Sequence, residues 1–350
     1  QRRDMEIKSI SFPAFFCVEL QELFAELGEF YDDYIYRRIA RLIYEKSWLS
    51  KADEQKIPLL DTSILKSELN EKYELLPHQK KFIELWDVLK GKLNLRGYIL
   101  AFGQGLGKTL TATSLALCKN KKKVYIVCPN TLTVNWAEEL KLYLKKYKDV
   151  NLWRDEVGIV GNSKYPVTKN CKYLICNNEG LDKLLPMIDL TGQDTMLVVD
   201  ESQNFRNYNG TRVNQLLSVA GKIKAGDVLL CSGTPIKALP NEIVPSLMLI
   251  DPLMTDDVAH TYHLAFNIDN TLAAQIVNRR FGMIMYRKTK EELDLPPREI
   301  KTVNVAISNS DPYLLSVVEM QVQEKFKIYY EEKLAKNDEL KQKYQSMVDR

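Results

Sequence analysis

The sequence predicts an α/β protein built on a buried parallel sheet with helices on both faces, and two observations support this class. Between residues 98 and 235, short apolar runs alternate with longer amphipathic stretches. Strands that are apolar on both sides need helices on both faces, and spacers of about twenty residues or more leave room for right-handed crossovers. The chain has 350 residues, of which 45% are hydrophobic and 27% charged, enough for two domains and a small appendage.

Five apolar runs are the predicted strands of this sheet. Each contains only aliphatic residues, methionine or tyrosine, as expected for a strand without a solvent-facing side. The runs are 98–101, 124–127, 173–175, 196–199 and 228–230. A helix is expected from Leu110 to Cys118, directly after the first run and a glycine-rich turn.

Both ends of the chain are expected to be helical and to lie outside the sheet domain. Residues 1–70 are rich in aromatic and charged residues and place apolar residues at helical spacing, which predicts a helical accessory domain. Residues 71–305 are assigned to the sheet domain. Residues 306–350 carry apolar residues at helical spacing and become increasingly charged, which predicts a helical protrusion.

Composition narrows the class of protein further. Lys and Arg total 49 against 46 Asp and Glu, so a basic surface must come from local clustering, for example in the lysine-rich stretch 119–148, which could also be simply solvated. Six cysteines without a C-x-x-C pair and three histidines indicate no structural metal and a reducing intracellular compartment, either cytoplasm or nucleus. No apolar run approaches the length of a membrane span.

The strongest local signal is a glycine-rich loop between the first predicted strand and the following helix. In this context backbone N–H groups close around phosphate oxygens at the helix N-terminus, a lysine neutralises the β- and γ-phosphates, and a hydroxyl can bind Mg²⁺. The residues are Gly103, Gln104, Gly105, Leu106, Gly107, Lys108, Thr109 and Leu110. The strict phosphate-loop pattern has glycine where this chain has Phe102, so a glycine turn without a ligand stays an alternative.

Two further strand ends carry polar residues suited to nucleotide chemistry. Asp200 and Glu201 follow an apolar run, so Asp200 could bind Mg²⁺ through water while Glu201 polarises an attacking water. Taken alone, such a pair is more often a solvated strand end. Ser232 and Thr234 follow the last run and could equally form a simple turn. Upstream, the amide of Gln79 has the donors and the acceptor needed to bind an adenine edge.

Taken in order, these segments resemble the first lobe of a superfamily 2 helicase of the Swi/Snf type. The resemblance covers about residues 74–305 and implies a RecA-like lobe that binds ATP and Mg²⁺ and tracks along one strand of duplex DNA. The segments are Leu76-Pro77-His78-Gln79, Gly105-Leu106-Gly107-Lys108-Thr109, Ile126-Val127-Cys128-Pro129 with Asn135-Trp136, Asp200 to Asn207, Ser232-Gly233-Thr234-Pro235-Ile236, and Tyr286-Arg287-Lys288-Thr289-Lys290 before Leu295-Pro296-Pro297.

The resemblance assigns roles residue by residue. It places nucleotide binding on Gln79 and the loop 103–110, Mg²⁺ on Thr109 and Asp200, and catalysis on Lys108, Asp200, Glu201 and Gln203. It places DNA contacts on Pro129, Asn130, Thr131, Asn135, Asn177, Asn178, Arg206, Asn207, Ser232 and Thr234. Family members commonly have histidine where Gln203 stands, although an amide can also form hydrogen bonds across the cleft. They also commonly have acids where this chain has Phe102-Gly103.

The resemblance also implies a second RecA-like lobe that supplies a catalytic arginine. No arginine after residue 235 has the expected motif around it, so we expect that lobe elsewhere in a longer chain, reached through the protrusion 306–350. Because such an arginine contributes about 10³–10⁵ in rate, the chain alone should bind ATP but hydrolyse it poorly.

The leading functional interpretation is a monomeric, DNA-dependent ATPase that moves on duplex or branched DNA during remodelling, branch migration or annealing. An ATP-gated nucleic-acid-binding or recruitment subunit is a second hypothesis. The motor part of a nuclease or transcription complex is a third.

Overall fold

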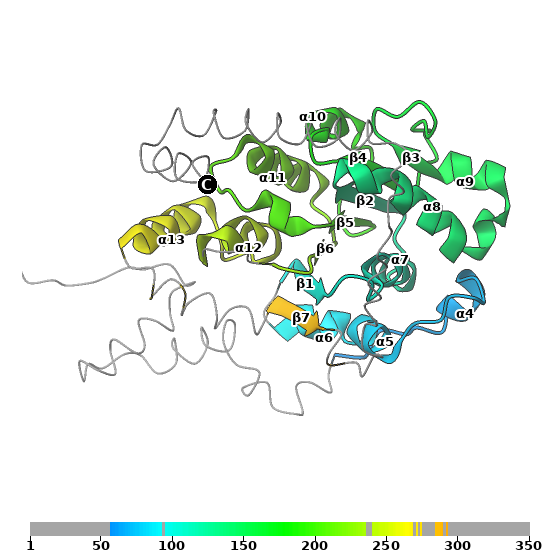
Figure 1. Cartoon of the computed structure of the whole chain (residues 1–350), viewed down its shortest axis with the longest axis horizontal. Coiled ribbons are helices and arrows are strands. Elements are labelled where there is room, and N and C mark those ends of the chain that lie inside the picture. Colours follow the sequence, from blue (N-terminus) through cyan, green and yellow to red (C-terminus); the bar gives the residue numbers. More distant parts are fainter. Residues whose placement is uncertain are drawn as a thin grey trace, which may run out of the picture. The chain divides into compact units, whose positions relative to one another are not determined.

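A sheet of seven parallel strands forms the centre of the structure, which is a computed structural model (Figure 1). The structure describes residues 57–92, 95–235, 240–268, 271, 274, 284–289 and 292. All of them fall in the first of two compact units, Gln1–Leu295. The helices expected in 1–56 and 306–350 lie outside the described residues.

The strand order across the sheet is β3-β4-β2-β5-β6-β1-β7, and every neighbouring pair is parallel. The strands are β1 (Gly97–Phe102), β2 (Lys123–Cys128), β3 (Val157–Ile159), β4 (Tyr173–Asn177), β5 (Thr195–Val199), β6 (Asp227–Cys231) and β7 (Met285–Lys288). The five predicted strands are confirmed as β1, β2, β4, β5 and β6. Strands β3 and β7 were not predicted, and both lie at the edges of the sheet.

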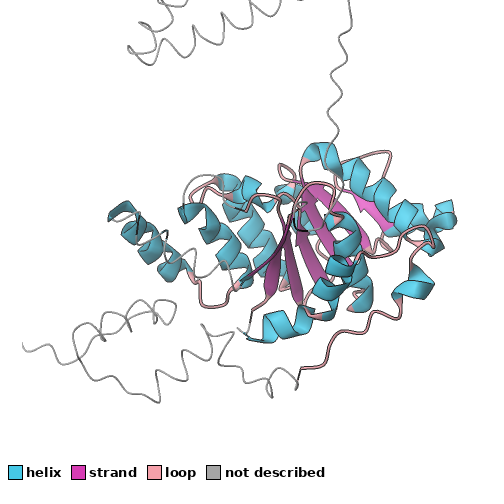
Figure 2. Cartoon of the chain, turned by 60° about the horizontal axis from the view of Figure 1, so that its bottom comes forward, coloured by secondary structure: helices cyan, strands magenta, loops and turns pink. Residues whose placement is uncertain are grey.

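Helices cover both faces of the sheet, as predicted (Figure 2). The α-helices are α4 (Leu65–Glu68), α5 (Pro77–Glu84), α6 (Trp86–Lys92), α7 (Lys108–Cys118), α8 (Thr133–Tyr143), α9 (Val150–Glu156), α10 (Leu181–Leu184), α11 (Thr211–Ile223), α12 (Val244–Ile250) and α13 (Asp256–Ile268). Short 3₁₀ helices are η2 (Asn130–Leu132), η3 (Lys145–Lys148), η4 (Leu185–Met187), η5 (Ser202–Phe205) and η6 (Pro240–Ile243). None of the described helices is long and apolar enough to cross a membrane.

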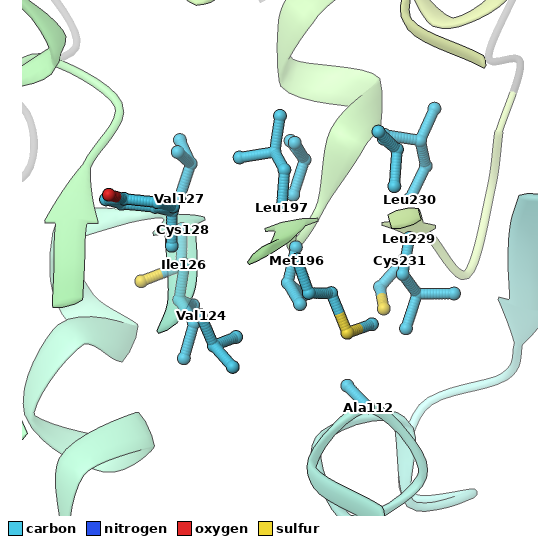
Figure 3. Close-up of a cluster of buried hydrophobic side chains, with 14 of the residues drawn as sticks. Ala112, Val124, Ile126, Val127, Cys128, Met196, Leu197, Leu229, Leu230 and Cys231 are labelled. Carbon is cyan, nitrogen blue, oxygen red and sulfur yellow. The ribbon is translucent and has the colours of Figure 1, made fainter. Parts of the chain in front are cut away.

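The central strands are fully buried because their side chains alternate between two helix layers. Met196 and Cys231 point toward Ala112 of α7, whereas Leu197 and Leu230 point to the opposite face (Figure 3). Fully burying a side chain of this size stabilises the fold by about 1.5–3 kcal/mol. This two-sided burial is why the strands are almost uniformly apolar in sequence.

The described part of the segment 1–70 packs against the sheet domain. Leu65 and Leu69 are buried in the same hydrophobic core as the strands. The backbone N–H of Asn70 donates to the carbonyl of Tyr143 at 2.7 Å, next to an isolated bridge between Leu69 and Leu144. Residues 57–70 therefore contribute to the core of the sheet domain.

A buried carboxylate joins three elements at the amino end of β6. Asp227 accepts a hydrogen bond from the indole of Trp86 at 2.6 Å and forms ion pairs with Lys90 and, at 2.6 Å, with Lys121. The Asp227 and Lys121 side chains are only 2% and 4% exposed. Burial alone would raise the pKa of Asp227, but the two lysine charges outweigh it and hold that pKa below its ordinary value.

Candidate functional site

The predicted site residues come together at one edge of the sheet. Strands β4, β2, β5, β6 and β1 are consecutive neighbours. Because all of them are parallel, their carboxyl ends lie at the same edge. A segment with predicted site residues lies at the carboxyl end of each of these strands. Open α/β sheets bind ligands outside this edge, so the topology alone gathers these segments into one site.

The glycine-rich loop has the backbone geometry of an anion cradle. Gly105 and Gly107 have φ angles of 80° and 77°, which only glycine adopts without strain. A Cβ atom on Gly107 would also lie 2.2 Å from the Nε2 atom of Gln79. Helix α7 begins immediately afterwards at Lys108, so its first N–H groups face the loop. This arrangement suits a phosphate group.

Gln79 lies against the loop, but its amide is bound to backbone groups. Its Nε2 atom donates to the carbonyl of Leu106 at 2.9 Å, and its Oε1 atom accepts from the N–H of Leu76 at 2.9 Å. The side chain is buried. Gln79 therefore supports the glycine loop directly, while its amide keeps a second N–H and a second lone pair that these two hydrogen bonds do not use.

The loop lysine faces the acid pair. The Nζ atom of Lys108 lies 3.4 Å from Oε1 of Glu201. Glu201 has a left-handed backbone conformation with φ of 49°, which is unusual for a residue with a side chain. Strain of this kind clusters at functional sites. A phosphate that took the Lys108 charge would leave the Glu201 carboxylate free to act on a water molecule.

Two hydrogen bonds hold the carboxylate of Asp200 in place. Its Oδ2 atom accepts a hydrogen bond from the indole of Trp136 at 2.9 Å, and its Oδ1 atom accepts from the N–H of Glu201 at 3.0 Å. Burial raises the pKa of the Asp200 carboxyl, while the hydrogen bond from Trp136 opposes that rise. Trp136 belongs to one of the motifs listed above but had no predicted role, and its hydrogen bond orients this carboxylate.

The oxygen donors at this edge fit Mg²⁺. The described residues contain no cluster of three or more His, Cys, Asp or Glu side chains that could form a metal cage. Mg²⁺ does not need one, because it is commonly bound by one or two protein oxygens together with substrate phosphates and water. Asp200 and Thr109 are the residues that would hold it here.

Gln203 links the acid pair to the end of β6. Its amide nitrogen donates to Glu201, and its amide oxygen accepts from the hydroxyl of Ser232 at 2.6 Å. The Ser232 oxygen in turn accepts from the backbone N–H of Thr234 at 3.1 Å. The bridge uses one donor and one acceptor of the amide, so the link needs a side chain that has both.

A polar groove of about 420 Å³ lies beside the acid pair. Its lining includes five of the predicted DNA contacts, namely Pro129, Asn130, Thr131, Asn178 and Arg206. It also includes Gln203, which connects the groove to the acid pair, and three residues that the sequence analysis missed, namely Glu179, Asn204 and Arg212. Asn204 lies within the segment Asp200 to Asn207, Glu179 directly follows a predicted contact, and Arg212 lies in the first turn of the next helix. Their closeness to the motifs was the signal that could have found them.

The other five predicted DNA contacts do not line this groove. The amide of Asn177 donates to Oδ1 of Asn130 at 3.1 Å and so supports the groove wall. Ser232 is buried beneath Gln203, and Thr234 is exposed next to it. Asn135 on α8 and Asn207 are both exposed but do not line the groove.

The lysine-rich stretch 119–148 is largely neutralised by the protein itself. The partners are Asp87 for Lys119, Asp227 for Lys121, Asp194 for Lys122, Asp189 for Lys123, the ring of Trp153 for Lys141, Glu71 for Lys145 and Glu156 for Lys146. Within the described part of the chain, Lys148 is the one lysine of the stretch without such a partner. The buried lysines Lys121 and Lys123 therefore have a structural role in their ion pairs.

Comparison with known proteins gives a family match over most of the chain. Residues 45–343 match the family described as the SNF2-related domain. One relative is the SWI/SNF-related matrix-associated actin-dependent regulator of chromatin subfamily A-like protein 1 of Xenopus tropicalis, 24% identical over 57% of this chain and 19% of its own length. A second is the DNA repair and recombination protein RAD54-like of Danio rerio, 27% identical over 57% of this chain and 29% of its own length.

A viral relative and a solved structure add to this match. The putative ATP-dependent RNA helicase L364 of Acanthamoeba polyphaga mimivirus is 27% identical over 50% of this chain and 33% of its own length. The chain thus spans between about a fifth and a third of these relatives. The SWI2/SNF2 ATPase core of Sulfolobus solfataricus, solved in complex with dsDNA, matches with a TM-score of 0.50 and 18% identity, over 63% of this chain and 45% of that one. This likeness supports the fold.

Proposed function

Because this chain belongs to the SNF2-related domain family, we propose that it is the first motor lobe of an ATP-dependent DNA translocase. The residues 71–305 would form the RecA-like lobe, which binds ATP with Mg²⁺ and engages duplex or branched DNA. The observation that carries the proposal is the direct connection between the two parts of the site. A glycine loop with its lysine and acid pair lies at the same sheet edge as a polar groove, and Gln203 belongs to both.

Each residue around the glycine loop would have one role in binding or hydrolysing ATP. Lys108 would neutralise the β- and γ-phosphates, and Thr109 and Asp200 would hold Mg²⁺, which when bound offsets the charge on the phosphates. Glu201 would orient and polarise the attacking water. The ion pair between Lys108 and Glu201 would then regulate the base. When ATP binds, its phosphates compete with the Glu201 carboxylate for Lys108, and Glu201 becomes free to act as the base.

The groove beside Gln203 would bind a DNA strand. Its wall contains amides and two arginines, groups that donate hydrogen bonds to phosphate oxygens and to sugars. We propose that a second RecA-like lobe in a longer chain supplies the catalytic arginine. The protein would act as a monomer on one duplex.

Replacing Glu201 with glutamine should separate binding from turnover. The amide keeps the size of the side chain but cannot act as a base, so ATP affinity should be retained while hydrolysis stops in a protein that includes the second lobe. Calorimetry with ATP and Mg²⁺ measures the first effect, and phosphate release measures the second. Asp194→Asn, which removes an exposed carboxylate at the opposite end of β5, is the control. Normal turnover by the Glu201→Gln protein would mean that another group is the base.

Replacing Gln203 with leucine should weaken the link between nucleotide and DNA. The leucine cannot bridge Glu201 and Ser232, whereas the variant Gln203→His retains a donor and an acceptor on its ring. Coupling between linked sites is typically about 1–3 kcal/mol, and Gln203→Leu should lose much of it. The measurement is ATP affinity with and without saturating duplex DNA. An unchanged DNA effect in the leucine variant would show that coupling runs through other residues.

A further inference from the structure

We propose that the N-terminus of α11 binds a backbone phosphate of the nucleic acid through Arg212 and Asn178, and that Glu179 occupies Arg212 until the phosphate arrives. The inference rests on the proposed function, because it places a further contact in the groove assigned to DNA. The resemblance to helicases assigned no role to Arg212 or Glu179.

The start of α11 attracts an anion. Helix α11 spans thirteen residues, and its first turn contains no acidic side chain. Its N-cap is Gly210, which offers no side chain to the free N–H groups of the first turn. The positive end of the helix dipole therefore has no capping side chain, and Arg212 in the same turn adds a full positive charge. Both features attract an anion to the start of α11.

A buried amide in the same groove lacks a partner. Asn178 is only 4% exposed, and its Oδ1 atom has no hydrogen-bond partner among the described residues. Leaving a buried polar atom unpaired costs free energy, so this side chain gains from a hydrogen-bonding partner in the groove. Turning the amide by 180° exchanges its oxygen and nitrogen. Asn178 can therefore donate a hydrogen bond to a phosphate oxygen.

In this structure the carboxylate of Glu179 is the anion paired with Arg212. Its carboxylate lies 3.1 Å from the guanidinium of Arg212, and both side chains are more than half exposed, at 51% and 57%. An exposed ion pair of this kind adds little to stability. A phosphate diester can therefore replace the carboxylate, and the arginine fork suits phosphate oxygens well.

The groove favours a nucleic-acid strand over a single free phosphate. Arg206 lines the groove as well as Arg212, and Pro129 to Thr131 form a further stretch of its lining. Two cations separated along one groove suit a ligand with repeated charges, such as a phosphodiester chain. Glu179 then acts as an internal competitor. It keeps the groove from holding nucleic acid too tightly, and it turns away when a strand engages.

The test compares three variants of the 350-residue chain in binding a fluorescent 20-base-pair DNA duplex by anisotropy at several salt concentrations. Arg212→Gln should weaken binding and reduce the salt slope by about 0.9, the value for one lost phosphate contact. Glu179→Gln should tighten binding about two- to fivefold, the range expected when an exposed competing ion pair is removed. The control Lys222→Gln removes a cation from the other end of α11 and should leave the slope unchanged. Thermal melting of each variant verifies that it is folded.

Three results would overturn the inference. The first is an Arg212→Gln protein whose affinity and salt slope equal those of Lys222→Gln. The second is a wild-type chain that does not bind the duplex. The third is a loss of inorganic phosphate binding in Arg212→Gln with unchanged duplex affinity, which would assign the site to free phosphate. ATP affinity of the same samples tests the proposed function separately. An Arg212-dependent salt slope without ATP binding would keep the phosphate site and reject the motor.

Discussion

A chain in which Lys108 is replaced by alanine is expected to lose measurable affinity for ATP. Lys108 begins α7 directly after the glycine loop, where the ammonium group would face the β- and γ-phosphates. Removing one partner of a close charge pair costs about 2–5 kcal/mol, so ATP affinity should fall roughly 30-fold or more. The loss also leaves Glu201 without its cation, which adds repulsion between that carboxylate and the phosphates.

Isothermal titration of ATP with Mg²⁺ measures the effect of Lys108→Ala. Lys119→Ala is a matched control, because this lysine lies just beyond the other end of the same helix and pairs with Asp87 at 2.8 Å. That variant should bind ATP as the wild-type chain does. If Lys108→Ala binds ATP with unchanged affinity while remaining folded, the glycine loop does not hold the phosphates.

The largest expected effect on stability comes from Asp227. Replacing it with alanine leaves Lys90 and Lys121 as like charges without a counterion and leaves the indole N–H of Trp86 without an acceptor. Breaking a buried ion pair by removing one partner typically costs about 3–5 kcal/mol. This is a large share of the total stability of a domain, and the variant should unfold at much lower urea concentration.

Urea unfolding of Asp227→Ala and of the exposed control Asp194→Asn provides the comparison. The pH dependence gives a second readout. The pKa of Asp227 is lowered in the folded state, so its contribution is fully present above its ordinary pKa and is lost as the pH falls through the lower folded value. The alanine variant should lack this component of acid destabilisation. Equal urea midpoints for Asp227→Ala and the wild type would show that this cluster does not stabilise the fold.

The central strands could be predicted because a strand buried on both faces contains almost only apolar residues. Strands β2 and β5 have no solvent-facing side, so they read as continuous apolar runs. Strand β7 lies at the sheet edge, is only partly buried and contains Arg287 and Lys288. Its sequence therefore does not differ from that of a charged loop. Strand β3 has only three residues, too few for a periodic pattern.

The same contrast separates the predicted site residues from those that were missed. Asp200 and Ser232 could be assigned because each directly follows a buried strand, and parallel strands bring such positions together. The ion pair of Arg212 with Glu179 joins segments far apart in sequence, and no local pattern marks it. Likewise, the lysines of 119–148 appear as a basic cluster in sequence because their carboxylate partners come from other elements.

The most direct test of the central claim is the rate of ATP hydrolysis with and without duplex DNA. The 350-residue chain should be compared with the longest natural open reading frame that contains it. We expect duplex DNA to accelerate hydrolysis strongly in the longer protein, whereas the shorter chain should bind ATP and turn it over slowly. If both proteins bind ATP and neither changes its rate when DNA is added, the chain is not the lobe of a DNA motor.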